Sequence, residues 1–418
     1  MEDSKIARKL RDQMVRFSGE LSGGLCKPAR RFVAEAVYGI QARQSVMLSE
    51  IGRALDEAIR LKKTENRLSN ELRRSGLGVH LTENLLTMAS SRVREDTLLV
   101  LDPSDIIKPY ARSMEHMTRV RDGSTGRLGN GYWTLQVIGV ELGEVRVTPL
   151  YHHLYSHVAP GFESENTEIL KCVGQISRHT GGRGIWVVDR GGDRRKLYRP
   201  FLDMGLRFII RLIGTRHVEC GGRRVLAREV AERCPMLYWD RVVKEDDGKE
   251  RVYQIGYGYR RVKLPGRREK LTMVVVRGFG EEPMMLLTNV EVKRSRRSCT
   301  FILDSYLRRW QIEDTIRCMK QSYGLENVRV LSYGRLQNLM VLALCAMYFA
   351  CVYLGDRARL RILAHYALRA GRRLFGIPDF RYYALADGIK RLLEALRRPF
   401  VARLVSEPSL LQPNLFDP

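Results

Sequence analysis

The sequence is short of acidic residues and lacks the cysteine spacing of several protein classes. It has 47 Asp and Glu against 72 Lys and Arg, which leaves a net charge of +25. None of its 8 cysteines lies in a C-x-x-C spacing, so a zinc ribbon or a thioredoxin-like motif is not expected. The N-terminus is charged and has no apolar stretch typical of a secretory signal. We therefore expect a cytoplasmic protein with reduced thiols.

The sequence also lacks an uncharged run long enough to be a clear membrane span. Residues 339–354 carry no charged side chain. This run is shorter than the roughly 20 residues that a transmembrane helix needs. We predict that it is a buried core helix.

The composition is that of a folded protein, and the charge indicates its partner. Hydrophobic residues make up 44% and charged residues 28%, as in ordinary globular proteins. A chain of 418 residues predicts two or three domains at roughly 100–200 residues each. Strong positive charge attracts polyanions, so DNA or RNA is the first expected partner and an acidic membrane surface the second.

The order of the hydrophobic patterns predicts an α/β protein with helical ends. Three strand-like runs from residue 97 onward are followed by helix, strand, helix and strand, which favours a mixed sheet flanked by helices. The helical residues before them fit either a nucleic-acid-binding module or a solvated extension. The predicted regions are a helical region at 1–95, the first part of the α/β core at 96–216, a β-rich insertion at 217–298, the second part of the core at 299–354 and a basic helical region at 355–418.

Three acidic residues are candidates for a metal site. Asp102 and Asp189 each end an apolar, strand-like run, and Glu313 lies on a predicted long helix. Three carboxylates held together need a cation, and hard oxygen ligands suit Mg²⁺ or Mn²⁺. Two such ions about 3.5–4 Å apart can promote phosphodiester cleavage. Asp105 and Asp193 follow the same two strands and remain rival ligands.

The predicted long helix places four chemically distinct side chains on one stripe. At about 100° per residue, Tyr306, Arg309, Glu313 and Lys320 point to roughly 0°, 300°, 340° and 320°. The carboxylate could bind a metal while the two cations hold phosphates. The alternative is a salt-bridged helix face, because Arg309 and Glu313 are an i,i+4 pair.

The four residues carry a resemblance to a known family. Their pattern, Y-(2)-R-(3)-E-(6)-K, is similar to the signature of the insertion-sequence-four family of bacterial DDE transposases. Asp102 resembles the first catalytic Asp of that family, and Asp189 with Gly191 resembles the second. Two departures are that Pro103-Ser104 follows the first Asp and that Gly192-Asp193 replaces a common aromatic after the second.

The resemblance implies an RNase H-like catalytic fold with the β-rich insertion between Asp189 and Glu313, and a DNA-end-binding role for residues 1–95. It implies cut-and-paste transposition, with two-metal cleavage at terminal inverted repeats followed by strand transfer into target DNA. It also implies that the protein acts as a homodimer on the DNA. The expected location is the bacterial cytoplasm, in association with the nucleoid. Asp102, Asp189 and Glu313 would hold two Mg²⁺ or Mn²⁺ ions, and Tyr306, Arg309 and Lys320 would position the DNA backbone.

Further candidates and rival functions stay open. The family can use an aromatic residue of the insertion to stabilise a flipped base, and Trp239 is the candidate, although packing would also explain it. Metal binding by His152, His153 and His157 is a minor alternative to packing. A metal-dependent nuclease without strand transfer and a catalytically inactive protein that binds element ends are the other functions to test.

Overall fold

The N-terminal region is a cluster of helices built around one buried helix. The computed structural model describes residues 2–123, 125–144, 146–246, 249–370, 382–396 and 399–402. Helix α2 has Pro28 in its first turn, where the missing N–H costs nothing, and its second half is buried almost all round. The helices of this region are α1 (Glu2–Leu21), α2 (Lys27–Arg43), α3 (Leu48–Leu55), α4 (Leu61–Leu72) and α5 (Leu77–Ala89), followed by the 3₁₀ turn η1 (Ser90–Arg92).

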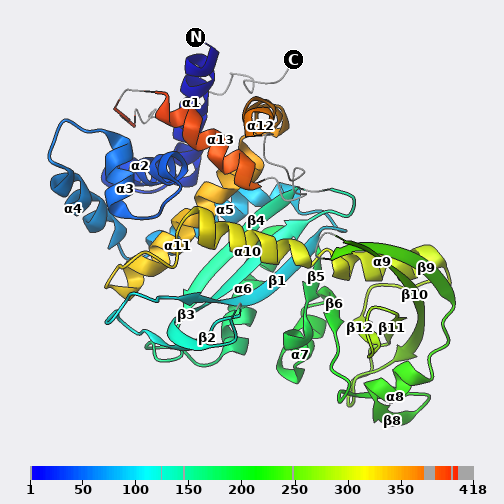
Figure 1. The fold of residues 1–418 in the computed structure, drawn as a ribbon. Helices are drawn as coiled ribbons and strands as arrows, with labels where there is room; N and C mark the ends of the chain where they lie inside the picture. The colour runs from blue at the N-terminus through cyan, green and yellow to red at the C-terminus, as the bar shows by residue number, and fades with distance from the viewer. Residues whose placement is uncertain are drawn as a thin grey trace.

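A ten-stranded mixed sheet forms the centre of the molecule (Figure 1). Its strand order is β2-β3-β1-β5-β6-β12-β11-β10-β9, and β4 also pairs with β3. Strand β1 is antiparallel to β3 and parallel to β5, and β5 is parallel to β6. The mixed sheet with flanking helices confirms the predicted α/β class. The first six strands are β1 (Leu98–Ile107), β2 (Thr118–Arg121), β3 (Leu128–Val140), β4 (Val147–Tyr155), β5 (Ile185–Val188) and β6 (Arg207–Arg211).

Alternate residues of the central strands pack into two different hydrophobic clusters. Leu99 and Leu101 belong to a cluster that includes α6 (Glu165–Thr180) and α7 (Arg195–Asp203). Leu98 and Val100 belong to a second cluster with α9 (Arg296–Leu307). Because successive side chains of a strand point to opposite faces, the central strands are covered on both sides.

The stretch 217–298 is β-rich, but most of it does not form a sheet of its own. Strand β12 pairs with β6 through Leu287↔Ile210, so four strands of the stretch extend the central sheet. Figure 1 shows this extension at the end of the sheet opposite the N-terminal helices. Only β7 and β8 form a separate two-stranded sheet. The elements are β7 (His217–Cys220), β8 (Arg223–Leu226), α8 (Ala227–Glu232), β9 (Tyr238–Asp246), β10 (Lys249–Val262), β11 (Leu271–Arg277) and β12 (Met284–Thr288).

The prediction of one continuous helix through Tyr306 and Lys320 is wrong. The chain forms α9 and then α10 (Trp310–Ser322), with Arg308 and Arg309 at the junction. There the N–H groups of Arg309, Gln311 and Ile312 bond three residues back instead of four. This tighter winding interrupts the α-helical hydrogen-bond pattern, so the angular positions inferred for one continuous α-helix do not carry across the junction.

The apolar run at 339–354 lies in helix α11 (Tyr333–Tyr348) and the following π-helical turn η3 (Phe349–Tyr353). By length and composition, Tyr333–Tyr353 could cross a membrane, but 89% of its apolar window is buried inside the protein. It packs against β4, α2 and α5. The prediction of a core helix is confirmed.

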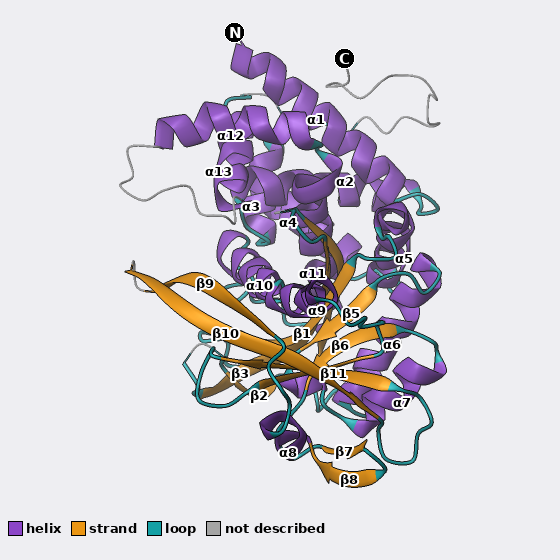
Figure 2. Cartoon of the chain, turned by 90° about the vertical axis from the view of Figure 1, so that its right-hand side faces the viewer, coloured by secondary structure: helices purple, strands orange, loops and turns teal. Residues whose placement is uncertain are grey.

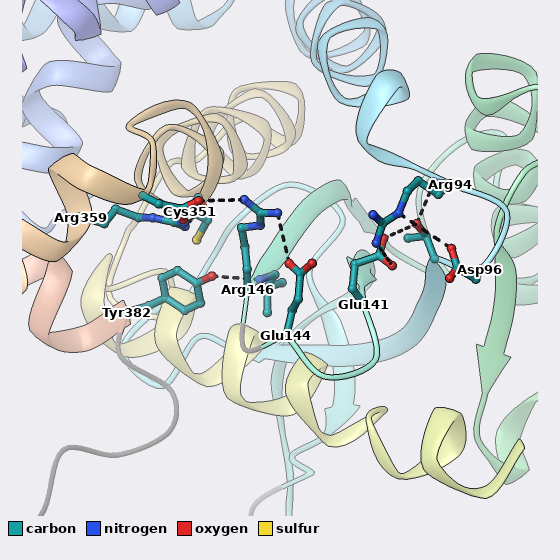
Figure 3. Close-up of polar contacts among 11 residues, drawn as sticks. Arg94, Asp96, Glu141, Glu144, Arg146, Cys351, Arg359 and Tyr382 are labelled. Carbon is teal, nitrogen blue, oxygen red and sulfur yellow. Dashed lines mark hydrogen bonds and ion pairs between the residues drawn. The ribbon is translucent and has the colours of Figure 1, made fainter. Parts of the chain in front are cut away.

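Two C-terminal helices, α12 (Asp356–Ala370) and α13 (Tyr382–Glu394), attach to the β3–β4 hairpin (Figure 3). Arg146 lies 3.1 Å from Glu144 and 3.4 Å from Asp356, and the N–H of Val147 donates to the Tyr382 hydroxyl at 2.9 Å. Figure 2 shows these helices beside the N-terminal ones at the same end of the sheet. Of the predicted basic region 355–418, residues 371–381, 397–398 and 403–418 lie outside the described residues.

Candidate active site

Asp102 and Asp189 lie side by side on neighbouring parallel strands. Leu101 of β1 pairs with Val188 of β5, and the next residue on each strand is the aspartate. Strand alternation places both carboxylates on the face that carries Val100 and Val187, which is the face of α9. Asp189 begins the short turn η2 (Arg190–Gly192), and its Oδ1 accepts the Gly191 N–H at 2.7 Å. Asp189 directly follows β5, but Asp102 lies inside β1: the parallel pairing with β5 stops at Leu101, while the antiparallel pairing with β3 continues to Ile107. The prediction that Asp102 ends its strand is therefore wrong, although both acids are held on regular backbone.

Glu313 reaches the same edge from the first turn of α10. The Arg309 guanidinium lies between it and Asp102. Nη2 donates to Glu313 Oε1 at 2.8 Å, and Nη1 lies 3.9 Å from Asp102 Oδ1. The helix junction therefore inserts one cation among the carboxylates, and the Arg309 side chain is largely buried there.

The three acids lie close enough for their charges to affect one another. Burial raises the pKa of Asp102 to about 7; Arg309 opposes this shift, while the charges of Asp189 and Glu313 add to it. The neighbouring acids also raise the pKa of the Arg309 guanidinium, against the opposing effect of its burial. The charges of two neighbouring carboxylates disfavour the ionised form of Asp102. The electrostatic potential at this site is therefore negative, and it attracts cations.

The donor set fits a hard divalent cation. Three carboxylates at one sheet edge are the oxygen ligands that Mg²⁺ and Mn²⁺ prefer. The described residues contain no group of three or more His, Cys, Asp or Glu side chains already closed to ligating distance. Arg309 occupies the space between Asp102 and Glu313, and its buried Nε has no hydrogen-bond partner in the described part of the chain. The site therefore has suitable ligands, but Arg309 has to move aside before two of them share an ion.

Lys320 lies on the last turn of α10 and contacts the rival acid Asp105. Its Nζ donates to Asp105 Oδ2 at 3.1 Å and lies 3.5 Å from Glu326 Oε1. The other oxygen of Asp105 accepts the Gly123 N–H at 3.1 Å. Asp105 thus has a partner for each oxygen, and the geometry favours Asp102 over it as a ligand.

The other rival, Asp193, is a structural acid. It is buried, and its Oδ1 accepts from Arg216 Nε at 2.6 Å and from the Tyr198 hydroxyl at 3.2 Å. Its Oδ2 accepts the Ile213 N–H at 2.7 Å. Three donors occupy most of the roughly four acceptor positions of this carboxylate, so Asp189 is the better candidate after β5.

The two predicted aromatic DNA contacts differ in exposure. Tyr306 is only 4% exposed and packs in the hydrophobic cluster of Val187 and Ile302, so its side chain does not lie on the protein surface. Trp239 is 57% exposed on β9. Its ring lies flat against Gly256 of β10, where a Cβ would come within 2.8 Å of it. Trp239 is therefore available to stack on a base.

The three histidines of YHHLYSH do not converge on a shared ion. His153 lies 3.3 Å from Glu168, whereas His157 stacks with Trp133 at a ring separation of 5.8 Å. His152 is buried, and burial lowers its pKa to about 4, followed by the effect of neighbouring His153. Packing accounts for all three.

Two residues near the site were missed from the sequence. Lys108 is buried, donates to the carbonyls of Leu325 and Val328, and so fixes the chain that follows α10 to the end of β1. Arg211 is the residue after Ile210, the partner of Val188, so it lies beside Asp189 on the next parallel strand. No local sequence signal distinguishes either cation from the many others, because their positions depend on strand pairing.

The fold and the site define a class of protein: a mixed α/β sheet with carboxylates at the point where the parallel pairing of two strands stops, on a strongly basic chain. Residues 147–349 match the family model of the transposase DDE domain. This match supports a DDE transposase; the matched range includes Asp189 and Glu313 but begins after Asp102.

One solved structure with a similar arrangement is a piggyBac transposase synaptic complex with hairpin DNA. The similarity has a TM-score of 0.43 and 11% sequence identity, and it covers 96% of this chain and 83% of that chain. No curated protein sequence matches this one.

Proposed function

We propose that this protein is a DDE transposase of the insertion-sequence-four family that moves its own element by cut-and-paste. It would cleave DNA at terminal inverted repeats and join the freed 3′ ends to target DNA. The observation that carries the proposal is the meeting of Asp102, Asp189 and Glu313 at one edge of the sheet, with Arg309 among them. The match of residues 147–349 to the transposase DDE domain supports it.

The carboxylates would bind two Mg²⁺ or Mn²⁺ ions, which when bound supply charge neutralisation and a more acidic water for phosphodiester cleavage. Asp102 and Asp189 would act from fixed strand ends, and Glu313 would approach from the helix. Arg309 would turn its fork from Glu313 to a phosphate, because a phosphate offers the same two-oxygen geometry as a carboxylate. Lys320 would add a second phosphate contact next to Asp105.

The remaining parts of the proposal concern the DNA. Tyr306 would act through packing under Arg309 and not by touching DNA. Trp239 would stack on a flipped base at the element end, since a flat exposed ring on rigid strands suits base stacking. Cleavage at paired ends would require a homodimer on DNA. The helical residues 1–95 would bind the terminal repeats, and the bacterial cytoplasm, at the nucleoid, would be the place of action.

Incubation of the protein with DNA that contains its element ends, in Mg²⁺ or Mn²⁺, tests the proposal. We expect nicks at the ends and joined products in added target DNA. The Glu313→Gln variant should bind the ends but neither nick nor join. Asp314→Asn is the matched control, because it removes the same charge one residue further along α10 and should retain activity. Nicking without joining would favour the nuclease alternative, and end binding without nicking by the native protein would favour the inactive one.

A further inference from the structure

Arg309 is a buried cation that lies between two of the candidate metal ligands. Its Nη1 is 3.9 Å from Asp102 Oδ1, and its Nη2 donates to Glu313 Oε1 at 2.8 Å. Only 11% of the Arg309 side chain is exposed. A cation held this close to two carboxylates offsets part of their negative charge, so these acids are partly neutralised before any metal ion binds.

The guanidinium of Arg309 makes few hydrogen bonds in this position. An arginine side chain has five N–H donors, and the described part of the chain accepts from Arg309 at one point, Glu313 Oε1. The contact with Asp102 is too long for a hydrogen bond, and the buried Nε has no partner among the described residues. Buried donors without acceptors cost free energy. Arg309 therefore gains hydrogen bonds if a ligand with several acceptor oxygens replaces Glu313.

The neighbouring aromatic ring gives the side chain a way toward the surface. The guanidinium carbon of Arg309 lies 5.3 Å from the ring centroid of Trp310, the first residue of α10, and Trp310 is 57% exposed. A guanidinium is attracted to an aromatic face at separations of up to about 6 Å. The cation can therefore shift along this ring toward solvent while it keeps the contact.

We propose that Arg309 is an internal counter-ion of the candidate site, and that it leaves the carboxylates when a DNA phosphate binds its guanidinium, which makes the binding of DNA and of the divalent cation cooperative. A phosphate offers two oxygens in the geometry of the carboxylate that Arg309 leaves. Without Arg309 between them, Asp102 and Glu313 attract a divalent cation more strongly. By linkage, the cation then raises the affinity for DNA by the same factor.

This inference rests on the proposed function, which supplies both the DNA and the divalent cation. It adds a regulation of the same site: the carboxylates bind their ions tightly only when DNA is in place.

The variant Arg309→Gln tests the counter-ion role in the absence of DNA. The signal of free Mn²⁺ in electron paramagnetic resonance measures Mn²⁺ binding. The variant Asp102→Asn/Asp189→Asn/Glu313→Gln, which we call the amide variant, gives the binding elsewhere on the protein. We expect Arg309→Gln to bind Mn²⁺ on the order of tenfold more tightly than the native protein, because a positive charge about 4 Å from a carboxylate is gone.

Arg308→Gln is the matched control. It removes the same charge one residue earlier in the junction between α9 and α10. The charge of Arg308 acts on Asp304, whose pKa is raised by burial and lowered by Arg308. The Mn²⁺ affinity of Arg308→Gln should therefore stay within about twofold of the native value, since exposed and more distant charges are screened.

A second titration adds a duplex of the element end that is already cut, so that cleavage does not change the DNA during the measurement. The amide variant with the same duplex gives the background. We expect the duplex to tighten Mn²⁺ binding to the native protein on the order of tenfold, and binding to Arg309→Gln less than about twofold, because that variant has no counter-ion to displace.

Arg309→Lys keeps the charge near the acids but cannot copy the two-oxygen contact with a phosphate. The duplex should therefore tighten its Mn²⁺ binding less than that of the native protein. This variant tests the same coupling if thermal unfolding shows that Arg309→Gln does not fold.

Three results would overturn the inference: equal Mn²⁺ affinities of the native protein and Arg309→Gln without DNA, an equal gain in Arg308→Gln, or an equal effect of the duplex on the native protein and the Arg309 variants. A different result would refute the metal site of the proposed function. In that case neither the native protein nor Arg309→Gln would bind more Mn²⁺ than the amide variant, with or without DNA.

Discussion

Asp189 and Asp193 are four residues apart after the same strand, yet their surroundings are opposite. Asp193 is buried and accepts hydrogen bonds from Arg216, Tyr198 and the backbone of Ile213. Asp189 accepts one hydrogen bond from its own turn and stands beside Asp102, whose pKa it helps to raise. Hydrogen-bond donors surround the carboxylate of Asp193, whereas the carboxylate of Asp189 faces other acids.

This difference separates a stabilising acid from a reactive one. A buried carboxylate with full partners holds the loop after η2 against β6, and its loss leaves Arg216 unpaired. Carboxylates that face one another store repulsion, which a bound cation would relieve. Ionisable groups whose pKa values are strongly shifted by their neighbours cluster at functional sites. Ion pairs with a full set of hydrogen bonds are common throughout ordinary protein structure.

The largest expected effect is on catalysis. Asp102→Asn or Glu313→Gln should lower the single-turnover nicking rate by on the order of a thousandfold or more, because each removes a charge from the proposed metal site. In Asp102→Asn the free energy of unfolding should stay equal to or above that of the native protein, since the ionised Asp102 is disfavoured in the fold. Nicking assays and denaturant titrations measure the two quantities. A native nicking rate in Glu313→Gln would refute the assignment.

Asp193→Ala should show the reverse pattern. Removing one partner of a buried ion pair costs about 3–5 kcal/mol of unfolding free energy. Denaturant titration measures the loss, and the nicking rate per folded molecule should change little. Asp203→Ala is the control: its pair with Arg267 is exposed, so the cost should stay under about 1 kcal/mol. Similar losses of unfolding free energy in Asp193→Ala and Asp203→Ala would contradict the stabilising role of Asp193.

His152 offers a third case, a titratable group that is buried without charge. Its pKa falls to about 4 in the fold from about 6.5 in the unfolded chain. The unfolded state therefore binds a proton first as the pH falls, and the protein should lose on the order of 3 kcal/mol between pH 6.5 and 4. In His152→Gln this part of the pH dependence should vanish. The exposed His217→Gln should keep it, and an unchanged slope in His152→Gln would contradict the burial argument.

The smallest expected effect is stabilisation by a metal ion. A ligand that binds only the folded state at 100 times its dissociation constant adds about 2.7 kcal/mol. Mn²⁺ should therefore raise the unfolding temperature of the native protein and of Asp193→Asn, but not that of a variant in which Asp102, Asp189 and Glu313 are all amides. An equal rise in the amide variant would place the ion elsewhere.

The two apolar strand runs before the acids were predictable from the sequence because they depend on local order, but the end of the first strand was not, since β1 continues through Asp102 to Ile107. TLLVLD and GIWVVD are apolar runs that end in an acid, and parallel strands bring such ends to one edge. The paired register of Leu101 and Val188 then sets the two aspartates side by side. The same reasoning failed for helix α10, since apolar spacing does not reveal a junction that three backbone bonds create at Arg309–Ile312.

Other features depended on contacts between distant segments. Strand β9 was not predicted, because it is an edge strand with charged residues, and its partner β10 defines it. The pairing of β12 with β6, which joins the stretch 217–298 to the central sheet, was not predicted because local patterns do not show pairing between distant strands. Tyr306 was expected on one stripe with Arg309 and Glu313, but it packs in a hydrophobic cluster with Val187 and Ile302.

The sequence by itself determined the α/β class, the basic character of the chain, the acids that follow two apolar strand runs and the helical state of the residues around Glu313, because these follow from short-range hydrophobic periodicity and composition. Only the tertiary structure decided which acid after each apolar run lacks a full set of hydrogen-bond donors. Asp105 meets Lys320 across 215 positions, and Asp193 meets Arg216 across 23. Such pairings depend on how strands and helices pack, so the chemistry of each carboxylate is a property of the fold.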